Sequence, residues 1–272
     1  KTVEELIEEI HRVLLDLDFA DDVRALGLRG TLDPERHPLL CEALVKARHR
    51  FRNRLTELGL DGIVEPFEPE RYNNQATIGE NLLFGTAVEA SFDPTHFPSN
   101  KVVRNVLAET GLEARLFEMG KEVAATTVEL FGDLSADNPF FDQLDYMDAD
   151  ELPEYRAALN RIGQMRLEEI SSADQKLILK LPFSYIESRN RLGLLDDELK
   201  STIVEARRKL RETLEELETP PVSFYDPDRY NAAASVLDNV LLGRISSTVA
   251  EAPERVTNAI RKLLAEMELT DD

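Results

Sequence analysis

Apolar residues recur every three or four positions along most of the chain, with charged residues between them. This spacing is typical of amphipathic helices. It predicts helices over 3–17, from just after Pro34 to Gly59, and over 77–90, 99–110, 113–131, 151–169, 172–191, 197–217, 235–246 and 252–268, with a kink expected at Pro182. Short pieces such as 62–67 and 222–225 favour an extended chain. We therefore expect a mainly α, multi-helix fold with little or no β structure.

One part of the sequence occurs twice. Residues 69–85 read PERYNNQATIGENLLFG and residues 227–243 read PDRYNAAASVLDNVLLG, and 8 of these 17 aligned positions are identical. The helix before each copy has the same apolar spacing: Leu40, Leu44, Ala47, Phe51, Leu55 and Leu58 match Leu199, Ile203, Ala206, Leu210, Leu214 and Leu217. A fixed spacing of this kind indicates a duplicated structural unit.

The duplication predicts the organisation of the chain. We expect one helical domain over 1–272, with repeat one at about 36–112, a connecting helical segment at about 113–194 and repeat two at about 195–269. Matching apolar positions imply matching packing, so the two repeats should superpose, in a pseudo-twofold arrangement around the connecting segment.

Composition narrows the function classes. The 32 basic and 53 acidic residues give a formal net charge of 32 − 53 = −21, which argues against non-specific binding to nucleic acid. Cys41 is the single cysteine, so an intramolecular disulfide is excluded and a reducing compartment is favoured. No apolar run reaches the roughly 18–20 residues of a membrane span. The acidic first twenty residues are unlike a secretory signal.

The sequence offers no constellation that is typical of an enzyme. His37 and Cys41 stand four apart, but Pro38 intervenes and no second pair completes a zinc site. Cys41 falls on the apolar side of its helix, which favours a core residue over a nucleophile. We expect neither catalytic residues nor a bound metal or cofactor in this chain.

The repeated segment resembles part of a known protein family. Residues 77–85, TIGENLLFG, are similar to the T-I-x-E-N-[IL]-L-F-G segment that follows the Q-loop of ABC transporter ATP-binding subunits, and 235–243 resemble the same segment. The lead-in Pro-Asp/Glu-Arg-Tyr-Asn also resembles a bacterial group of fused transporters with a helical insertion between Walker A and the signature motif. The resemblance implies a role in transport, in the cytoplasm at the inner face of the plasma membrane.

Departures from the family limit that resemblance. The chain has no Gly-x-x-x-x-Gly-Lys-[Ser/Thr] loop, no Leu-Ser-Gly-Gly-Gln signature and no Walker B strand. Where the Q-loop glutamine is expected, the chain has Glu68-Pro69-Glu70 and Asp226-Pro227-Asp228. The resemblance therefore implies a non-catalytic regulatory or coupling region, with ATP and magnesium bound only by the parent protein. Its partners would be the transmembrane and catalytic nucleotide-binding parts of the same transporter, and a homodimer stays open.

The two repeated loops supply the candidate functional residues. Thr77 with Glu80 has the spacing of a capping box, and Ser235 with Asp238 is a shorter-armed version. Tyr72 and Tyr230 precede these caps by five residues and are suited to pinning the incoming loops. The complete set of candidate coupling residues is Glu68, Glu70, Arg71, Tyr72, Asn73, Thr77, Glu80, Asn81, Asp226, Asp228, Arg229, Tyr230, Asn231, Ser235, Asp238 and Asn239.

Two alternatives stay open at this point. A free-standing acidic helical scaffold that binds other proteins would account for the same composition and repeats.

Basic residues also crowd the two long helices: Lys46, Arg48, His49, Arg50, Arg52 and Arg54 in the first, and Arg207, Arg208, Lys209 and Arg211 in the second. They indicate either a basic stripe for an acidic surface or anionic lipid, or ion pairs with the many carboxylates of the chain.

Overall fold

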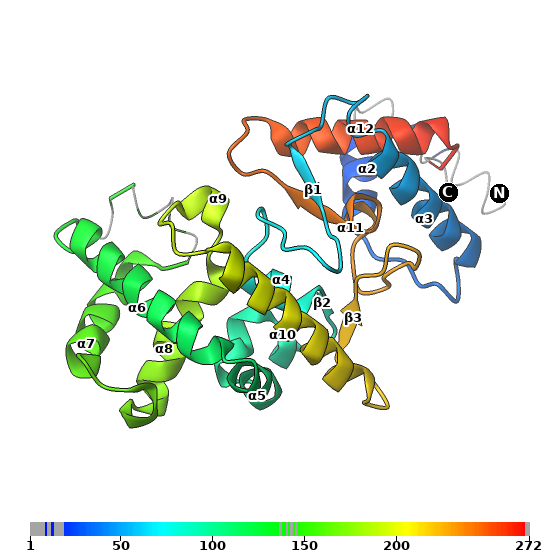
Figure 1. Cartoon of the computed structure of the whole chain (residues 1–272). Helices are drawn as coiled ribbons and strands as arrows, with labels where there is room; N and C mark the ends of the chain where they lie inside the picture. The colour runs from blue at the N-terminus through cyan, green and yellow to red at the C-terminus, as the bar shows by residue number, and fades with distance from the viewer. Residues whose placement is uncertain are drawn as a thin grey trace. The chain divides into compact units, whose positions relative to one another are not determined.

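The computed structural model describes residues 9, 12, 13, 19–135, 138, 139, 141, 144 and 146–269 (Figure 1). Helices account for 59% of the structure and strands for 5%, which confirms the expectation of a mainly α, multi-helix fold. Soluble domains average about one-third helix, so the helical content is high. Apart from residues 9, 12 and 13, the predicted helix 3–17 lies outside the described residues.

The chain forms two compact units that do not coincide with the two repeats. The first unit comprises the described residues up to Val64, Asp226–Gly243 and the described residues from Glu251 onwards. The second comprises Glu65–Tyr225 and Arg244–Ala250. The long helix of repeat one thus belongs to the first unit, whereas its loop and short helix belong to the second. Repeat two is divided in the opposite sense.

The first unit is built from helices α2 (Ala20–Arg29), α3 (Pro38–Asn53), α11 (Val236–Leu241) and α12 (Ala252–Glu266). Helix α11 contacts the other three. Leu44 and Phe51 of α3, Val240 of α11 and Ile260 of α12 are all buried, so the apolar faces of these helices form the core of the unit.

The second unit contains the remaining helices and most of the core. These are α4 (Ile78–Leu83), α5 (Lys101–Glu109), α6 (Leu112–Phe131), α7 (Leu152–Ile162), α8 (Ser172–Ser184), α9 (Glu187–Asn190) and α10 (Asp197–Glu215), with short 3-10 turns at Ala90–Phe92, Pro94–Ser99, Ala149–Glu151 and Leu167–Glu169. Helices α6 and α8 approach closely at Gly120, where a Cβ atom would lie 2.4 Å from the Ile178 carbonyl oxygen.

Short strands flank the repeated segments. The strands β1 (Val64–Pro66) and β3 (Val222–Phe224) confirm the extended chain that the sequence predicts there. Strands β2 (Gly85–Ala87) and β4 (Gly243–Ile245) follow the two short helices. Strand β2 pairs antiparallel with β3, and Gly85 lies opposite Phe224. A Cβ atom on Gly85 would lie 2.7 Å from the Ser223 carbonyl oxygen, so this pairing requires glycine.

Several helices end earlier than the apolar spacing predicts. Helix α3 ends at Asn53, because the backbone from Arg54 to Leu60 makes turn hydrogen bonds instead. The predicted helices 77–90 and 235–246 end at Leu83 and Leu241, because Phe84 (φ 44°) and Leu242 (φ 35°) adopt the left-handed conformation. The predicted helix 172–191 is two helices, α8 and α9, and α8 ends two residues after Pro182.

The order helix, strand, short helix, strand and then a longer helix recurs in both repeats, while their superposition and pseudo-twofold relation stay predictions.

Among the described helices, none is both long and apolar enough to cross a bilayer.

Candidate functional site

Each repeated loop is held by one buried arginine from the long helix of the other repeat. In the second unit, Arg207 of α10 donates from Nη1 to the carbonyl oxygens of Glu68, Pro69 and Arg71 at 3.1, 2.9 and 3.1 Å. Its Nε atom donates to the Asn81 carbonyl at 2.6 Å, and Nη2 donates to Asn81 Oδ1 at 3.0 Å. One side chain therefore fixes both the loop and the short helix α4.

The first unit repeats this arrangement. Arg48 of α3 donates from Nη1 to the carbonyl oxygens of Asp226, Pro227 and Arg229 at 2.8, 2.8 and 3.0 Å. Its Nε atom donates to the Asn239 carbonyl at 2.6 Å, and Nη2 donates to Asn239 Oδ1 at 3.1 Å. We use the name arginine clasp for each of these two arrangements. A clasp consists of the arginine together with the loop and the asparagine that it holds.

The acceptors of both clasps are carbonyl and amide oxygens. Arg48 and Arg207 are only 3% and 4% exposed. Burial away from water lowers the pKa of both guanidinium groups, and that of Arg207 falls to about 10. The planar guanidinium supplies several donors in fixed directions, which suits an array of carbonyl oxygens that a lysine could not match.

Aromatic rings pack against the clasp in the second unit. The Arg207 guanidinium carbon lies 4.4 Å from the centroid of the Phe84 ring. Phe84 in turn makes edge contacts with Phe67 and Tyr225, at centroid distances of 5.7 Å in each case, and Phe67 stacks on Tyr225 at 4.9 Å. The cation–π contact stabilises the buried charge.

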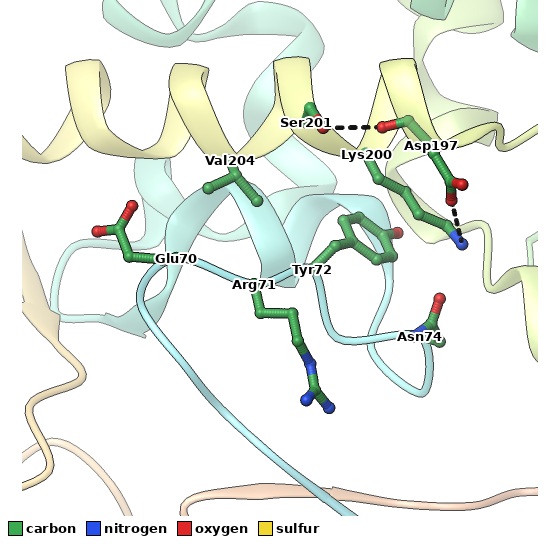
Figure 2. Close-up of a pocket in the computed structure, with 8 residues that line it drawn as sticks. All are labelled: Glu70, Arg71, Tyr72, Asn74, Asp197, Lys200, Ser201 and Val204. Carbon is green, nitrogen blue, oxygen red and sulfur yellow. Dashed lines mark hydrogen bonds and ion pairs between the residues drawn. The ribbon is translucent and has the colours of Figure 1, made fainter.

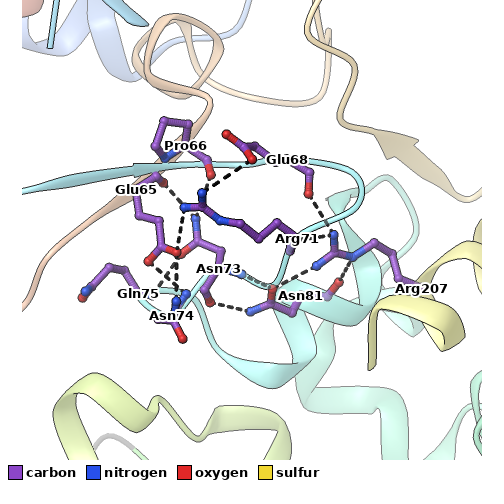
Figure 3. A network of polar contacts seen from close by, with 9 residues as sticks. All are labelled: Glu65, Pro66, Glu68, Arg71, Asn73, Asn74, Gln75, Asn81 and Arg207. Atoms are coloured by element: carbon purple, nitrogen blue, oxygen red, sulfur yellow. Dashed lines mark hydrogen bonds and ion pairs between the residues drawn. The ribbon is translucent and has the colours of Figure 1, made fainter. Parts of the chain in front are cut away.

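An asparagine side chain closes each loop onto its short helix, and Figure 3 shows the copy in the second unit. Asn81 is fully buried; its Oδ1 accepts from the Asn73 amide at 2.8 Å and its Nδ2 donates to the Asn73 carbonyl at 2.9 Å. Asn239 and Asn231 form the same pair of contacts at 2.8 Å each. Asn73 also donates to the Glu65 carbonyl at 2.8 Å, so the loop is bonded to the strand before it.

The predicted caps begin both short helices. Thr77 and Glu80 form the expected reciprocal box, because the Glu80 amide donates to Thr77 Oγ1 at 3.0 Å and the Thr77 amide donates to Glu80 Oε2 at 2.8 Å. The second cap differs from the prediction. The Asp238 amide donates to Ser235 Oγ at 3.0 Å, but the shorter Asp238 carboxylate accepts from the Ser235 hydroxyl at 2.6 Å.

The two tyrosines of the loops lie at different depths. Tyr72 is 5% exposed, and burial raises the pKa of its phenol strongly. Tyr230 is only half-buried, although desolvation raises its pKa too. The Tyr72 hydroxyl has no hydrogen-bond partner within the part of the chain that the structure describes.

The structure gathers the candidate residues into two separate groups. Those numbered 68–81 lie together in the second unit, and those numbered 226–239 lie together in the first. Glu68 and Asp226 contribute backbone carbonyls to the clasps. The exposed carboxylates among them include Glu70 and Asp228; Asp228 lies 3.1 Å from His49 Nε2. Their role as coupling loops stays a prediction.

Sequence reasoning missed the two residues that organise these groups. The sequence offers a basic stripe or ion pairs with carboxylates for Arg48 and Arg207, yet both side chains are buried and bond to backbone and asparagine oxygens. A signal was present: each arginine directly follows the fully buried Ala47 or Ala206, on the apolar side of its helix. Two arginines at equivalent, inward-facing positions of a duplicated helix indicate a shared internal role.

A pocket of about 510 Å³ lies beside the loop of the second unit (Figure 2). One wall is the loop and the other is the start of α10. Its lining residues are Glu70, Arg71, Tyr72 and Asn74 from the loop and Asp197, Lys200, Ser201 and Val204 from the helix. It therefore presents two carboxylates, two cations and an amide around the Tyr72 ring and the Val204 side chain.

The described residues contain no group of three or more histidine, cysteine or carboxylate residues placed to hold a metal ion. Cys41 is buried in the first unit, and burial raises the pKa of its thiol, which disfavours the reactive thiolate.

Comparison of the chain with protein-family models, with curated proteins and with solved structures gave no match.

Proposed function

We propose that this chain is a non-catalytic helical coupling region of an ABC transporter ATP-binding protein. The proposal rests on the resemblance of 77–85 and 235–243 to the segment that follows the Q-loop in that family. The observation that carries it furthest is the duplicated arginine clasp. Each clasp binds the loop of one repeat to the long helix of the other, so displacement of a loop also displaces a helix far away in sequence.

The contacts of the clasp suit a role in holding and moving a loop more than a role in catalysis. The arginine donors are directed at the backbone of the loop, and Asn81 and Asn239 are saturated by internal hydrogen bonds. A loop held this way keeps its shape when neighbouring parts move. In the parent protein, the two loops would transmit motion between the membrane part and the nucleotide-binding part without binding ATP themselves.

A free-standing helical scaffold is the second candidate function. The polar pocket beside Tyr72 favours it, because a module that binds other molecules needs such a surface. The reading frame that encodes the chain distinguishes the two candidates. A Walker A motif before this segment and a signature with Walker B after it would support the transporter. A frame without those motifs would contradict it.

Nucleotide binding by the chain itself gives a second test. Without a glycine-rich loop and its lysine, the phosphates of ATP have no nest of amide donors. We expect calorimetric titration of the chain with Mg-ATP to give no saturable binding at micromolar concentrations. Low-micromolar affinity would overturn the assignment as a non-catalytic region.

The coupling role needs the parent transporter. Arg207→Lys keeps the positive charge but loses the fork of donors, so we expect basal ATPase activity to persist and its stimulation by transported substrate to fall. Arg208→Ala, on the exposed face of the same helix, is the matched control and should leave both rates unchanged. The Arg207→Lys protein should still fold while its loop is less tightly held. If transported substrate then stimulates its ATPase activity to the normal extent, coupling through the clasp is rejected.

A further inference from the structure

Helix α2 of the first unit and helix α8 of the second unit end in the same way. Gly30 follows α2 and Tyr185 follows α8, and each has an extended backbone whose amide donates to the carbonyl three residues earlier, at 3.0 and 3.1 Å. The Gly30 carbonyl accepts from the amide of Val236, the first residue of α11, at 2.9 Å. The Tyr185 carbonyl accepts from the amide of Ile78, the first residue of α4, at 3.2 Å. Because α11 and α4 are the short helices of the two repeats, α2 and α8 hold equivalent places.

The outer faces of these two helices differ. Counted back from the two caps, Val23 corresponds to Ile178 and Leu26 corresponds to Leu181. Ile178 and Leu181 are fully buried, whereas Val23 is 42% exposed and Leu26 is 70% exposed. Phe19, one turn before Val23, is 53% exposed, so α2 carries an apolar stripe that consists of Phe19, Val23 and Leu26. Exposed apolar residues at this spacing mark a surface for another helix.

The second unit shows what covers the equivalent surface of α8. Helix α6 packs along α8, and a Cβ atom at Gly120 would lie 2.4 Å from the Ile178 carbonyl oxygen and 3.0 Å from Ile178 Cγ2. The two helices therefore need glycine at this crossing. In the first unit α2 packs against α11, and the described residues leave Val23 and Leu26 exposed. The apolar stripe is thus the open counterpart of an interface that the second unit forms internally.

The residues that this contact requires indicate the occupant of the apolar stripe. Helix α6 is already engaged on α8, and the same holds for α6 of a second copy. The segment 3–17 has apolar residues at helical spacing, but it contains no glycine, alanine or serine for a close approach like that at Gly120. We propose that the apolar stripe of α2 binds an amphipathic helix of a partner protein, which has the apolar face of α6 and a glycine where it crosses α2.

Titration of the full chain with a synthetic peptide of residues 111–131, followed by nuclear magnetic resonance, tests the proposal. The peptide has the sequence of α6, so it carries the face that fits the equivalent helix α8. We expect saturable shifts of the α2 amide signals, with a dissociation constant of about 1 mM or tighter. The same peptide with Gly120→Leu should bind about tenfold more weakly or worse, because the new side chain fills the space of the close approach.

Substitutions of two exposed leucines provide the matched test. Leu26→Asn changes the apolar stripe, whereas Leu39→Asn changes a leucine of α3 that is 79% exposed in the same unit. Both side chains are exposed, so both variants should fold. Leu26→Asn should weaken peptide binding about tenfold, and Leu39→Asn should leave it unchanged. Equal binding by the two variants would overturn the proposal, as would shifts confined to α8 or the absence of saturable shifts.

Two further measurements would assign the apolar stripe to other occupants. Self-association of the chain that Leu26→Asn abolishes would place a second copy there and overturn the proposal. Glu268 (φ 58°) repeats the left-handed backbone of Gly111 (φ 69°), which precedes α6. A fusion that continues with residues 113–131 after Leu269 therefore tests a helix in the same chain. Protection of the α2 amides from hydrogen exchange in this fusion, without binding of the free peptide, would also overturn a partner protein as the occupant.

Discussion

Arg207 bonds to Asn81 twice, through the backbone carbonyl at 2.6 Å and through Oδ1 at 3.0 Å, although the two residues are 126 positions apart. Arg48 and Asn239 repeat this relationship across 191 positions. In both cases the arginine and the asparagine come from different repeats. Each repeat therefore depends on the other for the donors that hold its loop.

Removal of the clasp arginine should strongly destabilise its unit. Arg207→Ala leaves carbonyl oxygens of the loop buried without donors, and we expect a loss of about 3–5 kcal/mol in the free energy of unfolding. Arg208→Ala, at an exposed position, should change it by less than about 0.5 kcal/mol. Urea denaturation followed by circular dichroism measures both. A loss of less than about 1 kcal/mol in Arg207→Ala would contradict a structural role for the clasp.

The exchange between repeats predicts which residues are energetically coupled. In a double-mutant cycle, Arg207→Ala and Asn81→Ala should show an interaction energy of about 0.5–3 kcal/mol, because the two side chains bond directly. Arg207→Ala and Asn239→Ala should be additive, because they belong to different clasps. Coupling of Arg207 to Asn239 in place of Asn81 would show that each repeat holds its own loop.

The two helix caps should contribute unequally. Thr77→Ala removes the acceptor for the Glu80 amide, and we expect a loss of roughly 0.5–2 kcal/mol. Ser235→Ala should cost more within that range, because the Ser235 hydroxyl both accepts from the Asp238 amide and donates to the Asp238 carboxylate, whereas the bond from the Thr77 amide to Glu80 survives in Thr77→Ala. Amide hydrogen exchange of α4 and α11 measures the local effect. Unchanged exchange of α4 in Thr77→Ala would exclude the cap as the start signal of that helix.

The buried tyrosines predict opposite responses to loss of a hydroxyl. Tyr155 is fully buried and its hydroxyl has no partner among the described residues, so Tyr155→Phe should be neutral or stabilising by about 1 kcal/mol. Tyr185 donates to Glu187 and accepts from the Leu192 amide, so Tyr185→Phe should destabilise by about 1–3 kcal/mol. Thermal unfolding at neutral pH measures both variants. A lower melting temperature for Tyr155→Phe than for Tyr185→Phe would contradict this assignment.

The same residues predict a loss of stability in alkali. Burial raises the pKa of Tyr72, Tyr155 and Tyr185 above the ordinary value near 10, so the unfolded chain ionises first. Their contribution is fully present below pH 10 and is lost as the pH rises above it. Ultraviolet titration should show these phenols ionising only with unfolding, and Tyr155→Phe should reduce the pH dependence. Ionisation of all the tyrosines near pH 10 in a folded protein would refute it.

The sequence predicts local structure well where one periodic pattern determines it. Helices α5 and α6 lie where the spacing places them, and the caps Thr77 and Ser235 begin helices because a side-chain acceptor acts within three residues. The left-handed Phe84 and Leu242 could not be predicted, because few residues other than glycine adopt that conformation. Here tertiary packing of the following strand decides where the helix ends.

The clasps could not be derived from spacing either. An arginine on an acidic protein suggests an ion pair, and the partners of Arg48 are carbonyl oxygens that every sequence contains. Which loop reaches which arginine depends on how the chain passes between the units. The identity of the loops was visible in the duplicated sequence, whereas their exchange required the three-dimensional structure.

The exchange of loops constrains how the two halves of the chain can change over time. A duplicated segment that keeps a complete set of its own contacts can change without affecting the other copy. Here a substitution at Asn81 removes an acceptor of Arg207, in the other half, and a substitution at Asn239 removes an acceptor of Arg48. Deletion of either half would remove one partner from both clasps at once. Each half of the chain therefore supplies contacts that the other half needs, so the loss of one half would leave the loop or the arginine of the other without its partner.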